Sequence, residues 1–289
     1  MREGVPTITA THYFAGIDIG STMTKAVILG DRIIASVIGP TGPEHRRLAG
    51  RVMQEALVQA GLALESIGAI VSTGYGRINV PFADKQVTEI TCHARGIVHL
   101  FPLARTVIDI GGQDSKAIRV DAAGRPTNFI MNDKCAAGSG RFVEVIADSL
   151  GVKLEDMGDL SLRSRNPAQI SNICTIWAQQ EVASRLAEGV SVPDLVAGIH
   201  KSLADRVARM VKRIKIEKEV VLTGGGAKNK GLAKALSEEL GCSLLIPPEP
   251  LITGALGAAL VGKDLWDKAL RTGKPLDTAP RSLRQIQIL

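Results

Sequence analysis

The stretch Tyr13–Leu29 reads Tyr-Phe-Ala-Gly-Ile-Asp-Ile-Gly-Ser-Thr-Met-Thr-Lys-Ala-Val-Ile-Leu, and Thr106–Val120 repeats its pattern as Thr-Val-Ile-Asp-Ile-Gly-Gly-Gln-Asp-Ser-Lys-Ala-Ile-Arg-Val. Each copy runs from an apolar strand through Asp-Ile-Gly into a turn of small polar residues. A lysine and a second apolar strand follow. Two halves that open with the same hairpin predict an α/β protein built from two duplicated lobes that face each other.

The spacing of apolar residues around these hairpins predicts the remaining elements. Helical periodicity marks 44–60, which ends at the plausible capping residue Gly61, and 88–101, which Pro102 stops. Further strands are expected at 32–38, 67–72, 126–131, 219–223 and 243–246, and further helices at 138–150, 174–188, 194–214, 229–240 and 252–261. The predicted domains are a first lobe at 12–102 completed by a helix at 250–265, a second lobe at 103–249, and a tail at 266–289.

The composition of the 289 residues is that of an ordinary globular protein, with 45% hydrophobic and 22% charged residues. The net charge is +6, but aromatic residues make up only 3%, and no basic and aromatic recognition motif for nucleic acid is present. The basic run from Arg206 to Lys218 is typical of a solvated helix face, with docking to an acidic partner as the alternative. With no signal peptide and no apolar run of membrane length, a cytoplasmic protein that binds neither membrane nor nucleic acid is expected.

The first Asp-Gly turn predicts a phosphate site. Asp18 ends a strand, and the backbone N–H groups of Gly20, Ser21 and Thr22 can approach a phosphate because Gly20 has no Cβ. Asp18 is expected to act through magnesium-bound water, since Mg²⁺ prefers oxygen ligands and keeps its own waters. Lys25 either neutralises phosphate or serves the second strand structurally.

The second Asp-Gly turn is the facing copy. Gly111 and Gly112 bring the backbone close to a ligand, and Asp109 or Asp114 can hold the water shell of the metal. Gln113 is neutral and polar, which suits a group that orients an attacking water. Either turn alone is more often simple turn chemistry, but both together at lobe spacing indicate a nucleotide site.

A third glycine turn, Leu222-Thr-Gly-Gly-Gly-Ala-Lys-Asn, follows an apolar strand and opens a helix at Asn229. Gly224, Gly225 and Gly226 let the backbone pass against a base or ribose, although a plain strand-to-helix turn is equally consistent with this stretch alone. It lacks the spacing of a P-loop and of the dinucleotide fingerprint. The small residues of Gly254–Ala259 predict a close contact between the lobes.

Two of the four cysteines lie in distinctive surroundings. Cys135 stands in Asn-Asp-Lys-Cys-Ala-Ala-Gly-Ser-Gly-Arg-Phe and Cys174 in Ile-Ser-Asn-Ile-Cys-Thr-Ile-Trp-Ala, and each is expected to open a helix. Isolated cysteines are usually buried small hydrophobes, which is how Cys92 and Cys242 are interpreted. A four-iron cluster needs four thiolates, so two per chain would require a symmetric dimer.

The three glycine turns and the small-residue helix, in this order, resemble the actin, hexokinase and Hsp70 ATPase superfamily. The resemblance implies two ribonuclease-H-like lobes that close over ATP. The two cysteine segments narrow it, because they look like the cluster motifs of the activators of 2-hydroxyacyl-CoA dehydratases and of the related ATPase subunits of benzoyl-CoA reductases. The resemblance extends from about Tyr13 to Val261.

This family resemblance implies a homodimer that shares one 4Fe–4S cluster, with Cys135 and Cys174 as its ligands from each chain. ATP, hydrolysed with Mg²⁺, would drive a low-potential electron from the cluster into a CoA-ester dehydratase or reductase component. Ferredoxin or flavodoxin would be the electron donor. Trp177-Ala-Gln-Gln-Glu departs from the aromatic-Ala-Glu-Ser-Glu pattern of dehydratase activators, which leaves the partner's substrate open.

Three functions are therefore compared: the dehydratase activator, the ATPase subunit of a benzoyl-CoA-type reductase, and a small-molecule kinase of the same superfamily, for example one acting on an amino sugar. A kinase needs a base that is aimed at an acceptor hydroxyl. Asp109 and Asp114 are the only candidates for that base. A non-catalytic, nucleotide-dependent assembly module is a further reading, which would bind ATP without hydrolysing it.

Overall fold

A computed structural model describes residues 12–171, 173–279 and 281–283, and its chain divides into two units. Within the described residues, the first unit comprises those up to Val87 and those from Gly254 onward, and the second runs from Thr88 to Thr253. The first boundary lies earlier than the expected position after Pro102. The reason is that helix α2 (Glu89–Leu100) packs its apolar side chains, among them Ile90 and Ile97, on the sheet of the second unit.

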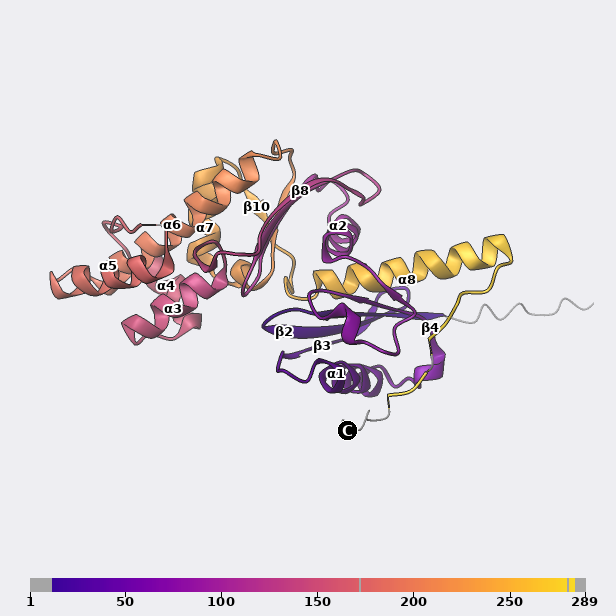
Figure 1. The fold of residues 1–289 in the computed structure, drawn as a ribbon. Coiled ribbons are helices and arrows are strands. Elements are labelled where there is room, and N and C mark those ends of the chain that lie inside the picture. The colour runs from indigo at the N-terminus through magenta and orange to yellow at the C-terminus, as the bar shows by residue number, and fades with distance from the viewer. Residues whose placement is uncertain (1–11, 172, 280, 284–289) are drawn as a thin grey trace, which may run out of the picture. The chain divides into compact units, whose positions relative to one another are not determined.

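The first unit contains a five-stranded sheet in the order β3-β2-β1-β4-β5. Strands β1, β2 and β3 are antiparallel neighbours, whereas β4 runs parallel to β1 and β5 parallel to β4. Helices α1 and α8 cover opposite faces of this sheet (Figure 1). The elements are β1 (Tyr13–Ile19), β2 (Met23–Leu29), β3 (Ile33–Pro40), α1 (His45–Ala60), η1 (Leu64–Ser66), β4 (Ile67–Thr73), η2 (Arg77–Asn79), β5 (Lys85–Gln86) and α8 (Thr253–Thr272).

The second unit repeats this sheet in the order β10-β9-β6-β7-β8, again with three antiparallel strands followed by two parallel ones. The duplicated lobes expected from the hairpin repeat are thus present. The strands are β6 (Thr106–Ile110), β7 (Ser115–Val120), β8 (Pro126–Asn132), β9 (Val220–Thr223) and β10 (Leu244–Leu245). The helices besides α2 are η3 (Ala136–Gly138), α3 (Gly140–Leu150), η4 (Leu154–Asp156), α4 (Met157–Leu162), α5 (Thr175–Ala187), α6 (Val192–Lys212), η5 (Gly225–Lys228) and α7 (Lys230–Leu240).

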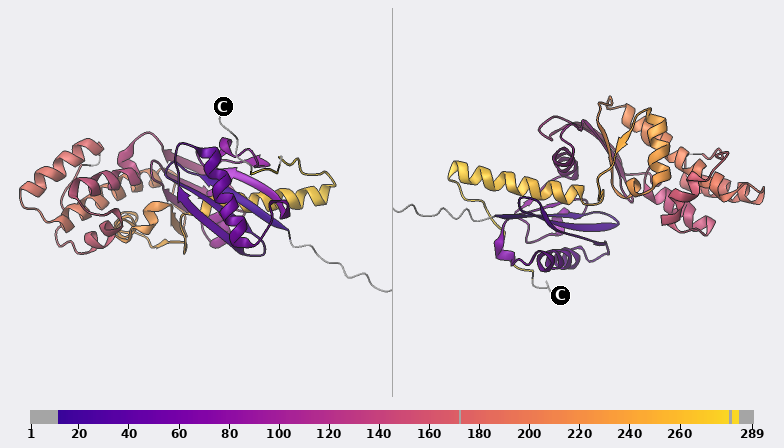
Figure 2. Two further views of the ribbon diagram at one scale, coloured as in Figure 1. Left: turned by 90° about the horizontal axis from the view of Figure 1, so that it is seen from below. Right: turned by 180° about the vertical axis from the view of Figure 1, so that it is seen from behind.

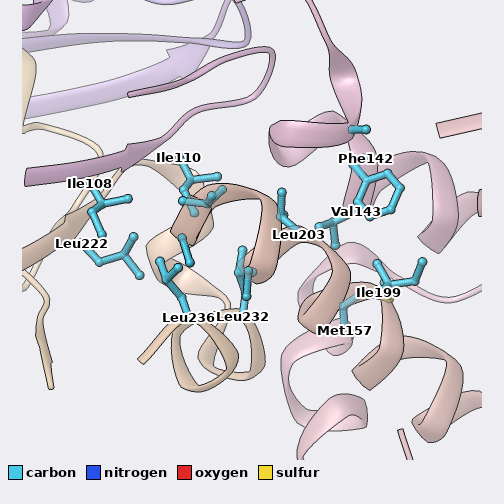
Figure 3. Close-up of a cluster of buried hydrophobic side chains, with 14 of the residues drawn as sticks. Ile108, Ile110, Phe142, Val143, Met157, Ile199, Leu203, Leu222, Leu232 and Leu236 are labelled. Atoms are coloured by element: carbon cyan, nitrogen blue, oxygen red, sulfur yellow. The ribbon is translucent and has the colours of Figure 1, made fainter. Parts of the chain in front are cut away.

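The main core of the second unit lies between its sheet and the helices on the face opposite α2 (Figure 2). Ile108 and Leu222, on neighbouring strands, contribute to this core together with Phe142 of α3 and Leu203 of α6 (Figure 3). All four side chains are fully buried. The core therefore connects β6, the strand that carries Asp109, with α3 and α5, the helices that follow the two distinctive cysteines.

Helix α8 packs inside the first unit. A Cβ on Gly16 of β1 would collide with the backbone of Ala255 and Ala259, so the small residues of this helix let it cross the strand closely. Within the first unit, the small residues of Gly254–Ala259 thus serve a contact between a helix and a sheet.

The helix also continues beyond the predicted end at Val261, and Trp266, which was expected in the tail, packs edge-on against Phe14. Farther along that expected tail, Arg281 pairs at 2.9 Å with the fully buried carboxylate of Asp84. No helix in the described part of the chain is long and apolar enough to span a membrane.

Candidate functional site

Asp18 is held in place at the end of β1. Its carboxylate is almost fully buried and accepts a hydrogen bond at 3.0 Å from Lys25, its cross-strand neighbour on β2. The turn between the strands is closed by the N–H of Gly20, which donates to the carbonyl of Met23 at 3.1 Å. Lys25 thus neutralises Asp18, while Ser21 and Thr22 remain at the tip of the turn and are partly or fully exposed.

Gly74 lies directly against Asp18. It follows β4, has a φ of +85°, and would place a Cβ onto the Asp18 carboxylate and the Ile19 carbonyl. Only glycine combines this left-handed conformation with so close an approach. The N–H of Gly76 then donates to the carbonyl of Ile19 at 2.9 Å. The loop 73–76 therefore shapes the turn, although Gly74 and Gly76 were not among the predicted site residues.

The second unit repeats this geometry around Asp109. Gly224, with a φ of +80°, would place a Cβ 2.6 Å from Asp109 Oδ1, and Gly226 packs on Ile110 as Gly76 packs on Ile19. The predicted residues Gly224 and Gly226 therefore meet the Asp109 turn, while nothing lies within 4 Å of a Cβ built on Gly225. The shared pattern Thr-Gly-x-Gly at 73–76 and 223–226 is the signal that could have identified Gly74 and Gly76.

A buried lysine organises the carboxylates of the second turn. Lys116 Nζ lies 3.2 Å from Asp109, 2.8 Å from Asp114 and 3.6 Å from Glu89. Burial by itself lowers the pKa of Lys116, but the three carboxylates outweigh it and raise that pKa well above its usual range. Lys116 is therefore a fixed cation. Its cross-strand pairing with Asp109 matches that of Lys25 with Asp18, which is the signal by which it could have been found.

Glu89 and His93 bring helix α2 into this cluster. Burial raises the pKa of the Glu89 carboxyl, Lys116 opposes that shift, and Asp114 adds to it. One turn along the helix, His93 Nε2 lies 3.9 Å from Asp109, while Nδ1 lies 3.1 Å from Thr253 Oγ1. The bond to Thr253 holds the ring of His93 in place beside Asp109. Glu89 was not predicted as a site residue, because it is distant from Lys116 in the sequence and only the packing of α2 on the sheet brings the two together.

Asn229 is positioned by a buried histidine. Its side-chain oxygen accepts from the N–H of Leu232 and so caps α7, and its Nδ2 lies 2.9 Å from Nε2 of His200. Burial lowers the pKa of His200 to about 4, so the ring is neutral at pH 7 and its Nε2 can accept from the amide. The loop of the third glycine turn therefore ends at a fixed position.

The turn of Gly111 and Gly112 is bonded to the segment that follows Cys135. The N–H of Gly140 donates to the Gly111 carbonyl at 2.9 Å, and that of Arg141 donates to the Gly112 carbonyl at 2.7 Å. In addition, the hydroxyl of Ser115 donates to the Gly138 carbonyl at 2.7 Å. Gln113, also in this turn, is exposed. Three hydrogen bonds thus connect the candidate phosphate turn to residues three to six positions after Cys135.

The two cysteines both lie in the second unit, each partly exposed, and each precedes a helical segment. Cys174 caps the long helix α5, as predicted. Cys135 precedes only the single turn η3, and the helix expected there begins at Gly140 instead, because the chain is extended at Ser139. Cys92 is fully buried in α2 and Cys242 packs against the core, in agreement with their structural reading.

Large apolar side chains surround Cys174. Ile173, Ile176 and Trp177 are 66%, 62% and 59% exposed. Among the described residues, no group of three or more histidine, cysteine or acidic side chains is arranged to hold a metal ion.

Comparison with known proteins identifies the relatives of the chain. Residues 15–262 match the family model described as the BadF/BadG/BcrA/BcrD ATPase family. The chain is 47% identical over 259 residues to the 2-hydroxyisocaproyl-CoA dehydratase activator of Clostridioides difficile, which covers 87% of this chain and 95% of that protein. It is 35% identical to one of the benzoyl-CoA reductase subunits of Thauera aromatica, over 90% of this chain and 96% of the relative.

Solved structures agree with this relationship. The Clostridium difficile activator with bound ADPNP matches with a TM-score of 0.84 and 44% identity, over 90% of this chain and 97% of that one. A ROK family glucokinase from Streptomyces griseus matches with a TM-score of 0.53 over 87% of this chain and 99% of that one. At 13% identity, this match shows a shared fold and says nothing about kinase activity.

Proposed function

The chain belongs to the BadF/BadG/BcrA/BcrD ATPase family, and from that premise we propose that it is an ATP-hydrolysing activator that delivers low-potential electrons to a 2-hydroxyacyl-CoA dehydratase. The activator is favoured over a reductase component because identity to a dehydratase activator is 47%, against 35% to the benzoyl-CoA reductase relative. The proposed electron donor is ferredoxin or flavodoxin.

One observation supports this function above the others. The hydrogen bonds from Gly140 and Arg141 to the Gly111 and Gly112 carbonyls make the phosphate turn and the Cys135 segment one connected structure. A nucleotide that moves this turn must therefore also move the backbone next to Cys135. An ATP-driven electron-transfer protein needs such a connection, whereas a kinase does not.

The proposed roles at the nucleotide follow from the two turns. The N–H groups of Ser21, Thr22 and Gly112 bind phosphate, and Gly224 to Gly226 with Asn229 support the nucleoside. The N–H groups of Gly20 and Gly111, which were expected to bind phosphate as well, already donate to the carbonyls of Met23 and Asp114 and instead hold the two turns in shape. Asp18 and Asp109 are buried acceptors, each already paired with a lysine, and are suited to hold the water shell of Mg²⁺. Asp114, 26% exposed in its side chain, is the more accessible acid beside Asp109.

Gln113 has the proposed role of orienting the water that attacks the terminal phosphate. It lies at the exposed tip of the second turn, between the two glycines that bind phosphate and Asp114. A neutral amide can both donate to and accept from that water, which a carboxylate cannot do.

The chain's cysteines fit a 4Fe–4S cluster shared between two copies. Cluster ligation takes four thiolates, and Cys135 and Cys174 give two from each chain. The exposed apolar side chains of Ile173, Ile176 and Trp177 beside Cys174 are suited to burial against a second copy. When bound, the cluster supplies a one-electron redox centre, and the backbone N–H groups at the start of α5 favour its negative charge.

Iron and sulfide analysis of anaerobically purified protein tests the proposal. The wild type is expected to contain about two iron atoms per chain, that is, about four per dimer. Cys135→Ser and Cys174→Ser should lose that iron, whereas Cys242→Ser, a matched change at a core-packed thiol, should keep it. Unchanged iron in both site variants would remove the cluster from the proposal.

The second candidate, a permanent component of a benzoyl-CoA-type reductase, is supported by the match to the Thauera aromatica reductase relative over 96% of that protein. The two functions differ in how firmly the partner is held. Copurification of a large iron–sulfur protein in the absence of oxygen would favour the reductase component, and isolation of the chain without one would favour the activator.

A further inference from the structure

A cavity of about 370 Å³ lies in the second unit between one face of helix α6 and strand β8. Its basic side is formed by Arg206, Arg209 and Arg213, which share a helix face because they are three and four residues apart. Met131 and Met210 form part of its apolar side. None of these residues has a role in the nucleotide site or at the cysteines.

The cavity adjoins Cys135. Asn132 and Gly138 both line it, and both hold the Cys135 backbone: Asn132 Nδ2 and the Gly138 N–H donate to the Cys135 carbonyl at 2.8 and 3.2 Å. On the cavity side, the Nε of Arg206 would lie 3.2 Å from a Cβ on Gly138, so the arginine row reaches the same turn. A molecule seated in the cavity would therefore be separated from the cysteine segment by a single layer of residues.

The charge around the cavity is strongly positive. Arg209 pairs with Asp205 at 2.8 Å, but this pair is exposed and water screens it. Exposed basic residues continue beyond the cavity along α6 and just past its end, at Lys212 and Lys215, and the chain as a whole carries a net charge of +6. An arginine row of this kind favours carboxylates, which guanidinium groups bind in a bidentate manner.

We propose that this surface, defined by the cavity and by Arg206, Arg209 and Arg213, is where the acidic face of a protein electron donor docks beside Cys135. The inference rests on the proposed function and adds the site at which the donor is recognised. A protein fits better than a small anion because the basic residues extend past the cavity. Nucleic acid is disfavoured because no aromatic residue for base stacking lines the cavity. The methionines give the flexible apolar contact that transient partners use.

The test measures binding of a purified, strongly acidic ferredoxin to the anaerobically isolated protein, by calorimetry over a range of salt concentrations. The double variant Arg209→Glu/Arg213→Glu is compared with Lys201→Glu, a matched charge reversal at an exposed position of the same helix that does not line the cavity. The double variant should raise the dissociation constant at low salt by about tenfold or more and weaken its salt dependence, whereas the control should stay within about twofold.

Iron content and ATP hydrolysis are measured on each variant, so that failure of this inference is distinguishable from failure of the proposed function. Protein without iron would remove the proposed function. Where iron content and ATPase activity are normal, the docking surface alone is tested. It is overturned if the double variant and Lys201→Glu weaken ferredoxin binding equally, or if neither of them weakens it. Loss of binding to the dehydratase component with ferredoxin binding intact would also overturn it. If the double variant does not fold, Arg213→Gln gives the same comparison with a smaller expected effect.

Discussion

At the scale of single residues, each of the two candidate nucleotide turns depends on a glycine that touches a buried aspartate. Gly74 lies against Asp18, and Gly224 lies against Asp109. Both glycines have positive φ, so they combine a conformation and a contact that no other residue tolerates. Each aspartate is thereby packed from the parallel neighbouring strand while its cross-strand lysine balances its charge.

The change Gly224→Ala is expected to destabilise the protein by roughly 2–4 kcal/mol, because a strained backbone conformation and a clash with Asp109 Oδ1 add together. Urea denaturation of the isolated protein measures this difference. The matched change Gly225→Ala meets nothing within 4 Å and has no positive φ, so its free energy of unfolding should stay within about 0.5 kcal/mol of the wild type. Equal effects of the two changes would contradict the packing described at Gly224.

His200 makes stability depend on pH. Its pKa is lowered to about 4 by burial, below the value of about 6.5 that it has in the unfolded chain. Between these values the unfolded state binds the proton that the folded state does not, so stability falls as the pH drops from 6.5 towards 4. This residue is expected to account for about 2 kcal/mol of lost stability between pH 8 and pH 5.

The measurement is a series of denaturation curves at pH 5 to 8 for the wild type and His200→Gln. Glutamine can still accept a hydrogen bond from Asn229 but does not titrate, so the variant should show a flatter dependence on pH in this range. Parallel curves for the two proteins would show that His200 is not the titrating group.

At the scale of elements, the decisive contact joins the hairpin of β6 and β7 to η3 and α3. Ser115, the first residue of β7, donates to the Gly138 carbonyl at the end of η3, and the bond is fully buried. Together with the bonds from Gly140 and Arg141, it joins the candidate phosphate turn directly to the Cys135 segment. The turn that is proposed to bind nucleotide and the segment that carries the thiol are therefore directly bonded.

Ser115→Ala is expected to weaken this connection and to cost about 1–2 kcal/mol of stability, because the Gly138 carbonyl loses a buried donor. In the iron-free protein, the rate of alkylation of Cys135 should differ between the ADP and ATP-analogue states, and the variant should reduce that difference. Ser149→Ala is the matched control, since Ser149 donates to the Val145 carbonyl on α3 without touching the turn. If Ser149→Ala reduced the difference in alkylation rate as much as Ser115→Ala does, the hydrogen bond from Ser115 to Gly138 would not be what connects the turn to Cys135.

At the scale of the whole molecule, the chain provides two partly exposed thiols and, among its described residues, no complete metal site. We expect the proposed cluster to take its remaining ligands from a second copy, against which the exposed apolar side chains beside Cys174 are suited to pack. Assembly and metal content then depend on each other, because a ligand set divided between two chains exists only in the dimer.

Removal of iron with a chelator should therefore shift the molecular mass of the protein from that of a dimer towards the 30.6 kDa of one chain. Analytical ultracentrifugation before and after chelation measures the shift, and Cys174→Ser should behave like the chelated wild type. A mass that stays at the dimer value in both cases would show that the contact between chains does not depend on the metal.

The sequence by itself determined the family, the duplicated α/β fold and the candidate turns. These depend on local chemistry: strand-end aspartates, glycines in tight turns, and residues that cap helices leave marks within a few positions of one another. Helices α1, α2 and α7 begin and end within about two residues of their expected bounds for that reason. The assigned roles of Asp18, Asp109, Gln113 and the two cysteines remain predictions.

Only the tertiary structure decided which distant residues meet. The positions of Glu89 beside Lys116, of Gly74 against Asp18 and of Ser115 under Gly138 follow from strand order and helix packing, which connect positions many residues apart and leave no local pattern. The same holds for α8, whose small residues fit the sheet of the first unit, and for Arg281, whose partner Asp84 is buried by the fold. Local chemistry thus specified the turns, while packing specified which turn is bonded to the cysteine segment.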